Sequence, residues 1–277
     1  MKLVRSLVIT GFGINCEIEM AAAYSFAGAE TKIVHLNQIF NEKVSIHDYD
    51  IINFPGGFSY GDDLGSGKVL SNKIKFKKMK SGRFFFDEIM RFLNDGKYIF
   101  GVCNGFQLLV KTGLLPNING NFEQEVTLTF NDSGHFENRW CHCVRATKNV
   151  TPFLIDIDRI DLPIRHGEGK LIVRNEEIGS LIIENSLNCL SYCDNNGNPT
   201  DDYPLNPNGS QFACAGLTNK TGQIFGMMPH PEAFIAIYNH PNWPRFITDS
   251  NTTDEMGAGL TLFKNIVTYI QKRSMNQ

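Results

Sequence analysis

The first hundred residues alternate between short apolar runs and amphipathic stretches. The apolar runs, each typical of a buried strand, cover residues 3–10, 31–36, 50–54 and 97–102. The amphipathic stretches, typical of helices, cover residues 16–27 and 83–93. Asn15 is the expected N-cap of the first helix, and Gly28 is its expected stop. Strands that alternate with helices predict an α/β fold, a mostly parallel sheet flanked by helices, with sites beyond the carboxyl ends of the strands.

From about Val126 the pattern changes to short strands and turns, with no linker between the halves. A hairpin is predicted over residues 211–228, a closing helix over 258–271, and polar loops over 194–210 and 235–257. We therefore expect antiparallel additions and loop insertions in the C-terminal half. No repeat or low-complexity tract divides the chain, so one domain over residues 1–277 is predicted.

Composition and charge exclude several classes of function. The 277 residues carry a net charge of −3, which gives no general electrostatic reason to bind nucleic acid or an anionic membrane. No apolar run approaches the roughly 20 residues of a spanning helix, and the N-terminal run reads as a first strand rather than a signal peptide. Seven cysteines are scattered over a long chain, which favours reduced thiols and a cytoplasmic location.

The segment GVCNG places a cysteine at a corner between a strand and a helix. The strand ends at Val102 and the helical pattern resumes at Phe106, so Cys103 occupies the turn between two glycines. This is the sequence of a nucleophile elbow with cysteine in place of serine. The helix N-terminus favours the thiolate, and the backbone N–H of Asn104 would lie beside it as an oxyanion donor. Gln107, one turn on, would reach back toward the thiol. The alternative is a buried core cysteine.

A thiolate nucleophile needs a partner that handles protons. In MMPHPEA, His230 and Glu232 are separated by a proline and preceded by another. If the prolines keep this segment extended, both side chains point the same way, and Glu232 orients the imidazole of His230. The sequence therefore predicts a Cys-His-Glu triad in which His230 is the acid and base.

Two further motifs carry glycines. In IRHGEGK, His166 and Glu168 suit a flexible loop that contacts a ligand or a partner. In NFPGGFSYGDDLGSG, a strand runs into Gly56 and Gly57, whose freedom lets backbone N–H groups turn toward an oxyanion. The loop lacks the spacing of a P-loop, and a plain turn is the alternative.

Other residues offer competing interpretations. Cys16 also lies at a predicted helix start, but Glu17 and Glu19 disfavour a thiolate there. Cys141, His142 and Cys143, with Cys189 and Cys193, lack the usual spacing of zinc ligands, and alternation along a strand explains the first pair. No metal site is therefore predicted. The basic run over residues 73–80 is expected to be a solvated face. Arg139 pairs with a substrate carboxylate, a partner or a surface carboxylate.

The motifs GGFSYGDD, GVCNGFQ, HGEG and MMPHPE occur in one order, and together they resemble those of the class I glutamine amidotransferases, which have a flavodoxin-like fold. Within them, Asn15-Cys16-Glu17, FENRW over residues 136–140 and above all HGEG are similar to the glutaminase subunits of phosphoribosylformylglycinamidine synthase. The loops 194–210 and 235–257 depart from the shorter subunits of that family and are similar to its longer members.

The resemblance implies roles for the residues already singled out. Cys103 would attack glutamine, His230 would protonate the departing ammonia and Glu232 would hold His230. The substrate-binding residues would be Gly57, Phe58, Asn104 and Gln107, with His166, Glu168 and Arg139 as contacts to a partner or substrate. Ammonia would pass to a large synthetase subunit, which would bind ATP and Mg²⁺, and a small accessory subunit would belong to the same complex.

 In such a complex this chain would need no cofactor of its own, and glutamine would be its only small-molecule substrate.

Two other classes of function compete with this one. A different amidotransferase or a thiol hydrolase on the same fold would also use the elbow, but HGEG and GGFSYGDD argue against it. A non-catalytic scaffold or thiol sensor would share the elbow as well. The segment from Pro229 to Glu232 argues against a sensor, because a sensor needs no oriented histidine.

Overall fold

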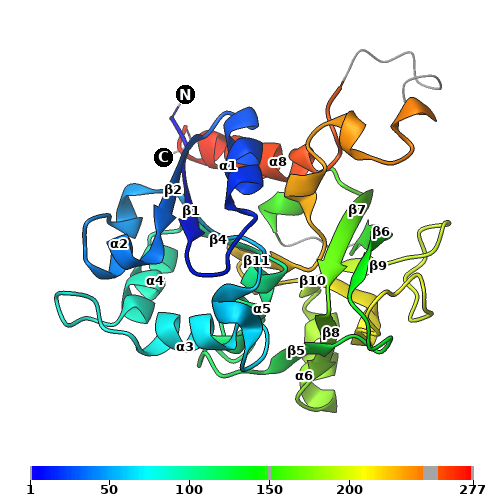
Figure 1. Ribbon diagram of the computed structural model, residues 1–277, viewed down its shortest axis with the longest axis horizontal. Helices are drawn as coiled ribbons and strands as arrows, with labels where there is room; N and C mark the ends of the chain where they lie inside the picture. The colour runs from blue at the N-terminus through cyan, green and yellow to red at the C-terminus, as the bar shows by residue number, and fades with distance from the viewer. Residues whose placement is uncertain (1, 147, 149–150, 246–254, 276–277) are drawn as a thin grey trace.

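The computed structural model describes residues 2–146, 148, 151–245 and 255–275. A nine-stranded sheet crosses the molecule in the order β2-β1-β3-β4-β11-β10-β9-β6-β7 (Figure 1). Its parallel half consists of β2 (Glu30–His35), β1 (Arg5–Thr10), β3 (Ile51–Phe54), β4 (Tyr98–Val102) and β11 (Ile224–Met227). Every residue of β3 and β4 is buried, as expected for strands that helices cover on both faces.

The other half of the sheet is antiparallel. It consists of β10 (Cys214–Thr218), β9 (Asn188–Tyr192), β6 (Glu137–Arg145) and β7 (Arg159–His166). The predicted hairpin is confirmed, since β10 pairs with β11 across the turn at residues 219–222. A separate two-stranded sheet joins β5 (Val126–Phe130) to β8 (Glu168–Val173). The antiparallel additions predicted for the C-terminal half are therefore present.

Helices cover both faces of the parallel strands (Figure 1). One face carries α1 (Glu17–Phe26) and α8 (Leu260–Arg273), which contact each other. The opposite face carries α3 (Lys68–Phe76), α4 (Phe85–Asn94) and α5 (Asn104–Lys111). The short helix α2 (Leu36–Phe40) follows β2, and α6 (Glu176–Glu184) follows β8. This arrangement confirms the predicted α/β class, whereas a single domain over residues 1–277 stays a prediction.

The start of α1 differs from the sequence-based expectation. Its N-cap is Cys16 rather than Asn15, and neither side chain caps the helix through a hydrogen bond to a backbone N–H. The backbone N–H groups of both residues instead donate to the carbonyl of Gly56, at 3.3 and 3.4 Å. The segment NFPGGFSYGDDLGSG, residues 53–67, is called the glycine-rich loop from here on. Its contact with residues 15 and 16 sets where the helix begins. The expected stop is confirmed, because Gly28 follows the helix with φ of +89°.

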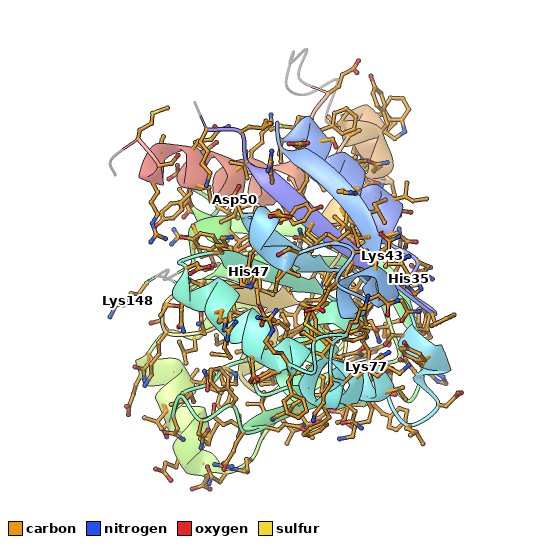
Figure 2. All side chains as sticks on the ribbon, turned by 90° about the vertical axis from the view of Figure 1, so that its left-hand side faces the viewer. His35, Lys43, His47, Asp50, Lys77 and Lys148 are labelled. Carbon is orange, nitrogen blue, oxygen red and sulfur yellow. The ribbon has the colours of Figure 1, made fainter. Side chains whose placement is uncertain are left out.

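The basic run over residues 73–80 is only partly a solvated face. The Lys75 ammonium donates to the carbonyls of Thr112 and Phe122, at 3.2 and 2.9 Å. Lys77, labelled in Figure 2, lies 4.4 Å from the centre of the Phe40 ring. These lysines hold neighbouring segments together, so the run has a structural role that its charge alone did not reveal.

The polar loop at 194–210 packs into the molecule. Asn206, Asn208 and Ser210 are buried, and the Ser210 hydroxyl accepts a hydrogen bond from the Leu171 N–H at 2.9 Å. The loop therefore braces β8, although its sequence reads as an excursion into solvent. In the loop at 235–257, residues 246–254 lie outside the described residues. No helix in the described ranges is long and apolar enough to cross a membrane.

Candidate active site

The elbow predicted at GVCNG is confirmed. Cys103 joins β4 to α5 with φ of 52° and ψ of −105°, a backbone conformation that is costly for a residue with a side chain. The flanking glycines are needed for close packing. A Cβ on Gly105 would overlap the carbonyl oxygen of Phe54, and one on Gly101 would lie 2.6 Å from Leu109 Cδ1. The strained turn presents the thiol at the carboxyl end of the sheet.

His230 and Glu232 form the expected pair. The Nδ1 atom of His230 lies 2.6 Å from Oε1 of Glu232, and both residues are 2% exposed. The expected extended backbone is wrong, because Pro231–Ala233 form a 3₁₀ turn. In that turn the carboxylate folds back onto the imidazole, so a turn rather than strand alternation brings the two side chains together.

The electrostatics of His230 favour the protonated imidazole. Burial alone would lower its pKa, but the Glu232 carboxylate and the nearby thiols of Cys103 and Cys16 raise the pKa of His230 well above its usual value. The imidazolium is thus stabilised between a carboxylate at Nδ1 and two sulfur atoms on its other side. A histidine in this state can donate a proton to a leaving amine.

A cavity of about 170 Å³ opens at this end of the sheet. Its lining residues are Asn15, Cys16, Gly57, Phe58, Cys103, Phe136, Asn138, Arg165 and His230. Cys103 is therefore a cavity thiol rather than a core thiol, although it is only 5% exposed. Gly56 adjoins the same group: a Cβ there would lie 2.7 Å from His230 Cε1, 3.3 Å from Cys16 Sγ and 3.5 Å from Cys103 Cβ.

The expected oxyanion donors lie around this cavity. Asn104 is the first residue of α5, where backbone N–H groups have no partner within the helix. Gly57 and Phe58 line the cavity, and a Cβ on Gly57 would collide with the backbone of residues 13–15. The Phe58 N–H, however, donates to the carbonyl of Gly13 at 2.7 Å. In this structure that N–H is bound to the protein itself.

Comparison with known proteins identifies the family. A family model for the CobB/CobQ-like glutamine amidotransferase domain matches residues 3–270. The chain belongs to this family. A subunit PurQ of phosphoribosylformylglycinamidine synthase from Dehalococcoides mccartyi is 40% identical over 98% of this chain and all of that protein. The same subunit from Methanococcus maripaludis is 41% identical over 96% of this chain and 97% of that protein.

A solved structure agrees with these relatives. The structure of PurLQS from Thermotoga maritima matches with a TM-score of 0.69 and 27% identity, covering 97% of this chain and all of that chain. The amidotransferase described here therefore belongs to the PurQ subunits, and both resemblances drawn from its motifs are confirmed.

Gln107 and Glu168 connect motifs that are distant in the amidotransferase sequence. The Gln107 amide donates to the Glu168 carbonyl at 2.5 Å and accepts from Asn104 Nδ2 at 3.0 Å. Its position one turn along the helix had suggested a contact with the Cys103 thiol, but its amide is hydrogen-bonded to these two residues instead. The Glu168 carboxylate accepts from the Ser66 N–H at 3.2 Å. Hydrogen bonds through Glu168 thus join helix α5, the HGEG motif and the glycine-rich loop.

His166 lies deeper than HGEG suggests. The flexible loop expected here is wrong, because His166 ends β7, only Gly167 separates it from β8, and its side chain is 2% exposed. Its Nδ1 atom lies 3.1 Å from Asn131 Oδ1. Burial, with a smaller effect of nearby His230, lowers the pKa of His166 to about 3. His166 is thus an interior residue of this chain, and its role as a contact to a partner or substrate stays a prediction.

The arginine that lines the cavity is Arg165, whereas the sequence had pointed to Arg139. Arg139 Nε lies 3.1 Å from Oε2 of Glu137, a buried residue, so the structure contains an ion pair, although not the exposed surface pair that was the alternative. Arg139 is absent from the cavity lining, whereas Arg165 is part of it. Arg165 pairs with Asn138 across β6 and β7, and both residues are exposed. The sequence reasoning missed both, because only strand register places them beside Cys103.

The cysteines away from the cavity are structural. Cys141 and Cys143 are buried on one face of β6, with sulfur atoms 3.9 Å apart, as strand alternation predicts. Among the described residues, the one group of potential metal ligands that comes together is Cys16, His230 and Glu232. All seven cysteines of the amidotransferase are free thiols.

Proposed function

We propose that this chain is the glutaminase subunit of phosphoribosylformylglycinamidine synthase. It hydrolyses glutamine to glutamate and ammonia, and it passes the ammonia to the synthetase subunit. The observation that supports this most directly is the convergence of an elbow cysteine with an oriented histidine in one cavity. The names of the close relatives supply the larger reaction to which this ammonia belongs.

In the first half of the reaction, the Cys103 thiolate attacks the side-chain amide carbon of glutamine. A tetrahedral intermediate forms, and its oxyanion is bound by the N–H groups of Asn104 and Gly57. The Phe58 N–H joins them only after it releases the carbonyl of Gly13. His230 then gives its proton to the amide nitrogen, the C–N bond breaks, and ammonia leaves a γ-glutamyl thioester on Cys103.

In the second half, His230 removes a proton from water, and the resulting hydroxide attacks the thioester. The C–S bond breaks and glutamate is released, while the proton held by His230 restores the starting state. Glu232 acts throughout as the orienting carboxylate, because its oxygen holds Nδ1 and leaves the opposite ring nitrogen toward the thiols. The sum of the two halves is glutamine plus water giving glutamate plus ammonia.

Arg165 and Asn138 are the proposed anchors for the α-carboxylate of glutamine. They lie directly opposite each other on neighbouring strands and both line the cavity with Cys103. A guanidinium binds a carboxylate through charge-assisted hydrogen bonds, and the neighbouring amide adds a further donor. Glutamine held in this way would extend its side-chain amide toward the elbow.

The remaining steps belong to the partner subunits. We propose that the large synthetase subunit binds ATP and Mg²⁺ and converts formylglycinamide ribonucleotide to the amidine, and that a small accessory subunit joins the complex. The solved complex from Thermotoga maritima, PurLQS, supports this assembly. Seven free thiols fit a reducing cytoplasm, which is the proposed location.

Covalent labelling of the thiol tests the proposal. A glutamine-analogue electrophile is reacted briefly with the chain, with and without glutamine, and the labelled cysteines are mapped by mass spectrometry. We expect labelling at Cys103 that glutamine prevents. Labelling at Cys16, or unprotected labelling across several cysteines, would refute the role of the elbow.

The same role is tested in the assembled complex by Cys103→Ala. This variant should lose glutamine-dependent synthesis and keep ammonia-dependent synthesis, because the synthetase still receives its nitrogen donor. Cys141→Ala, which removes a buried thiol outside the cavity, is the matched control and should keep both activities.

A further inference from the structure

The side chain of Asn104 joins the elbow to the glycine-rich loop. Its Oδ1 accepts a hydrogen bond from the Ser59 N–H at 3.2 Å. Its Nδ2 donates to Asp62 Oδ1 at 3.2 Å and to Gln107 Oε1 at 3.0 Å. Asn104, Ser59 and Gln107 are at most 3% exposed. Both N–H donors of this amide are used, so the side chain has no donor left for glutamine, and its role lies in what it holds.

The segment that Asn104 holds has a strained backbone. Tyr60 and Asp62 have φ of 57° and 53°, in the left-handed region that residues with a side chain disfavour, and Gly61 lies between them with φ of 74°. Such a conformation is costly and persists only where surrounding contacts enforce it. The two hydrogen bonds from Asn104, at Ser59 and at Asp62, bracket this stretch. They therefore help to keep the strained turn in place.

Asp62 fixes the orientation of the Asn104 amide. A carboxylate only accepts hydrogen bonds, so it selects the Nδ2 side of the amide and leaves Oδ1 toward Ser59. The same Asp62 oxygen accepts from the Gly67 N–H at 3.1 Å, which closes the loop over residues 62–67. At Gly67 the loop returns to α5, because a Cβ there would lie 3.1 Å from the backbone nitrogen of Leu108. The loop is thus attached to α5 at both ends of this turn.

The residue that Asn104 holds directly follows the proposed oxyanion donors. Gly57 and Phe58 line the cavity with Cys103, and Ser59 is the next residue of the chain. Asn104 itself directly follows Cys103. One side chain therefore ties the residue after the nucleophile to the residue after the donors. This distance matters because a donor stabilises an oxyanion only when it lies about 2.7–3.1 Å from it.

We propose that the Asn104 side chain is a positioning group for the oxyanion donors, and that Asp62 orients it. The inference rests on the proposed glutaminase function, since it concerns the oxyanion of the same reaction. Asn104 sets the distance between the thiol and the N–H groups of Gly57 and Phe58. It also keeps Ser59 fixed while the Phe58 N–H leaves the Gly13 carbonyl for the oxyanion. Without this side chain the strained turn relaxes and the donors move, while the thiol keeps its place in the elbow.

Two reactions of the Cys103 thiol separate positioning from general damage. Hydrolysis of glutamine passes through an oxyanion, whereas alkylation by iodoacetamide displaces iodide from carbon and forms none. In the assembled complex, Asn104→Ala should lower kcat for glutamine by about 100-fold, the typical loss when an oxyanion donor is missing or misplaced by about 1 Å. The rate of alkylation at Cys103, followed by mass spectrometry on the full-length chain, should not change. An equal fall in both rates, or an unchanged kcat, would overturn the positioning role.

Exchanging the amide and the carboxylate tests the part assigned to Asp62. Asn104→Asp keeps an acceptor for the Ser59 N–H but sets a second carboxylate against Asp62, so kcat should fall as it does in Asn104→Ala. Adding Asp62→Asn returns a donor to this contact, and the double variant should regain about 10-fold in kcat, the usual contribution of one hydrogen bond to a charged group. Recovery is partial because Gln107 Oε1 stays without its donor. A double variant no more active than Asn104→Asp would overturn the orienting role.

Asn188→Ala is the matched control. It removes another buried amide, which donates to the Ser191 hydroxyl and the Phe212 carbonyl outside the cavity, and it should keep kcat. The unmodified complex separates the two claims. If it hydrolyses glutamine and Asn104→Ala does so equally well, only the positioning role fails, whereas no hydrolysis by the unmodified complex refutes the glutaminase function and this inference with it. If Asn104→Ala does not fold, as judged by circular dichroism, the exchange variants decide, because they preserve the size of both side chains.

Discussion

Asn138 and Arg165 lie directly opposite each other on β6 and β7 and line the cavity that holds Cys103. If they bind the α-carboxylate of glutamine, Arg165→Gln weakens substrate binding with little change in kcat. A hydrogen bond to a charged group is worth about 1.5–3 kcal/mol, so KM for glutamine should rise about 10- to 100-fold. Steady-state glutaminase kinetics of the complex give both constants.

Arg159 supplies the control for that prediction. It lies at the other end of β7, is exposed, and donates to the carbonyl of Asn195. Arg159→Gln should leave KM for glutamine unchanged. Equal KM values for the two variants would contradict the assignment of Arg165 to the substrate.

Glu232 should control the pH dependence of hydrolysis through His230. Although burial opposes protonation, the carboxylate raises the pKa of the imidazole, and the protonated form is needed when ammonia leaves. Removing an opposite charge this close typically changes a pKa by about 1–3 units. In Glu232→Gln the pKa of His230 falls, so the alkaline limb of the kcat/KM profile should move to lower pH. A lower kcat with an unmoved alkaline limb would argue against this role.

Gly56 should be needed for catalysis because of the space beside it. An alanine Cβ at this position would lie 2.7 Å from His230 Cε1, so the imidazole has to move. Misplacing a catalytic group by about 1 Å can cost about 100-fold, and Gly56→Ala should lower kcat by about that factor. Gly11→Ala is the matched control in a nearby loop, since its Cβ would meet only Ile14 Cδ1 at 3.8 Å. Equal activity of the two variants would contradict the prediction.

His166 should make the fold sensitive to acid. Its pKa is about 3 in the folded chain and about 6.5 when unfolded, so between these values the unfolded chain binds a proton that the folded chain does not. Stability therefore falls as pH falls through this window. The contribution lost from pH 7 to pH 5 is about 2 kcal/mol at 1.36 kcal/mol per unit.

Urea unfolding at the two pH values measures this effect. His166→Gln should lose about 2 kcal/mol less than the unmodified chain between pH 7 and pH 5, whatever its stability at pH 7. His135→Gln, which changes an exposed histidine, should keep the original difference. An unchanged difference in His166→Gln would show that this imidazole is not the acid-sensitive group.

The sequence by itself determined the parallel half of the sheet and the elbow. Residues 50–54 and 97–102 are mostly apolar short runs, as strands covered on both faces require, and the glycines beside Cys103 mark a turn where helix and strand backbones nearly touch. The pairing of His230 with Glu232 also followed from local spacing, although the backbone that produces it is a turn.

Only the tertiary structure decided which distant side chains share the cavity. Cys16 reaches His230 because the glycine-rich loop bonds to the start of α1, and Arg165 faces Cys103 because of the register between β6 and β7. Burial likewise converted His166 from an expected contact residue into an interior one. Local patterns report backbone preferences and spacing, whereas contacts between segments far apart in the chain depend on packing that no single stretch of sequence contains.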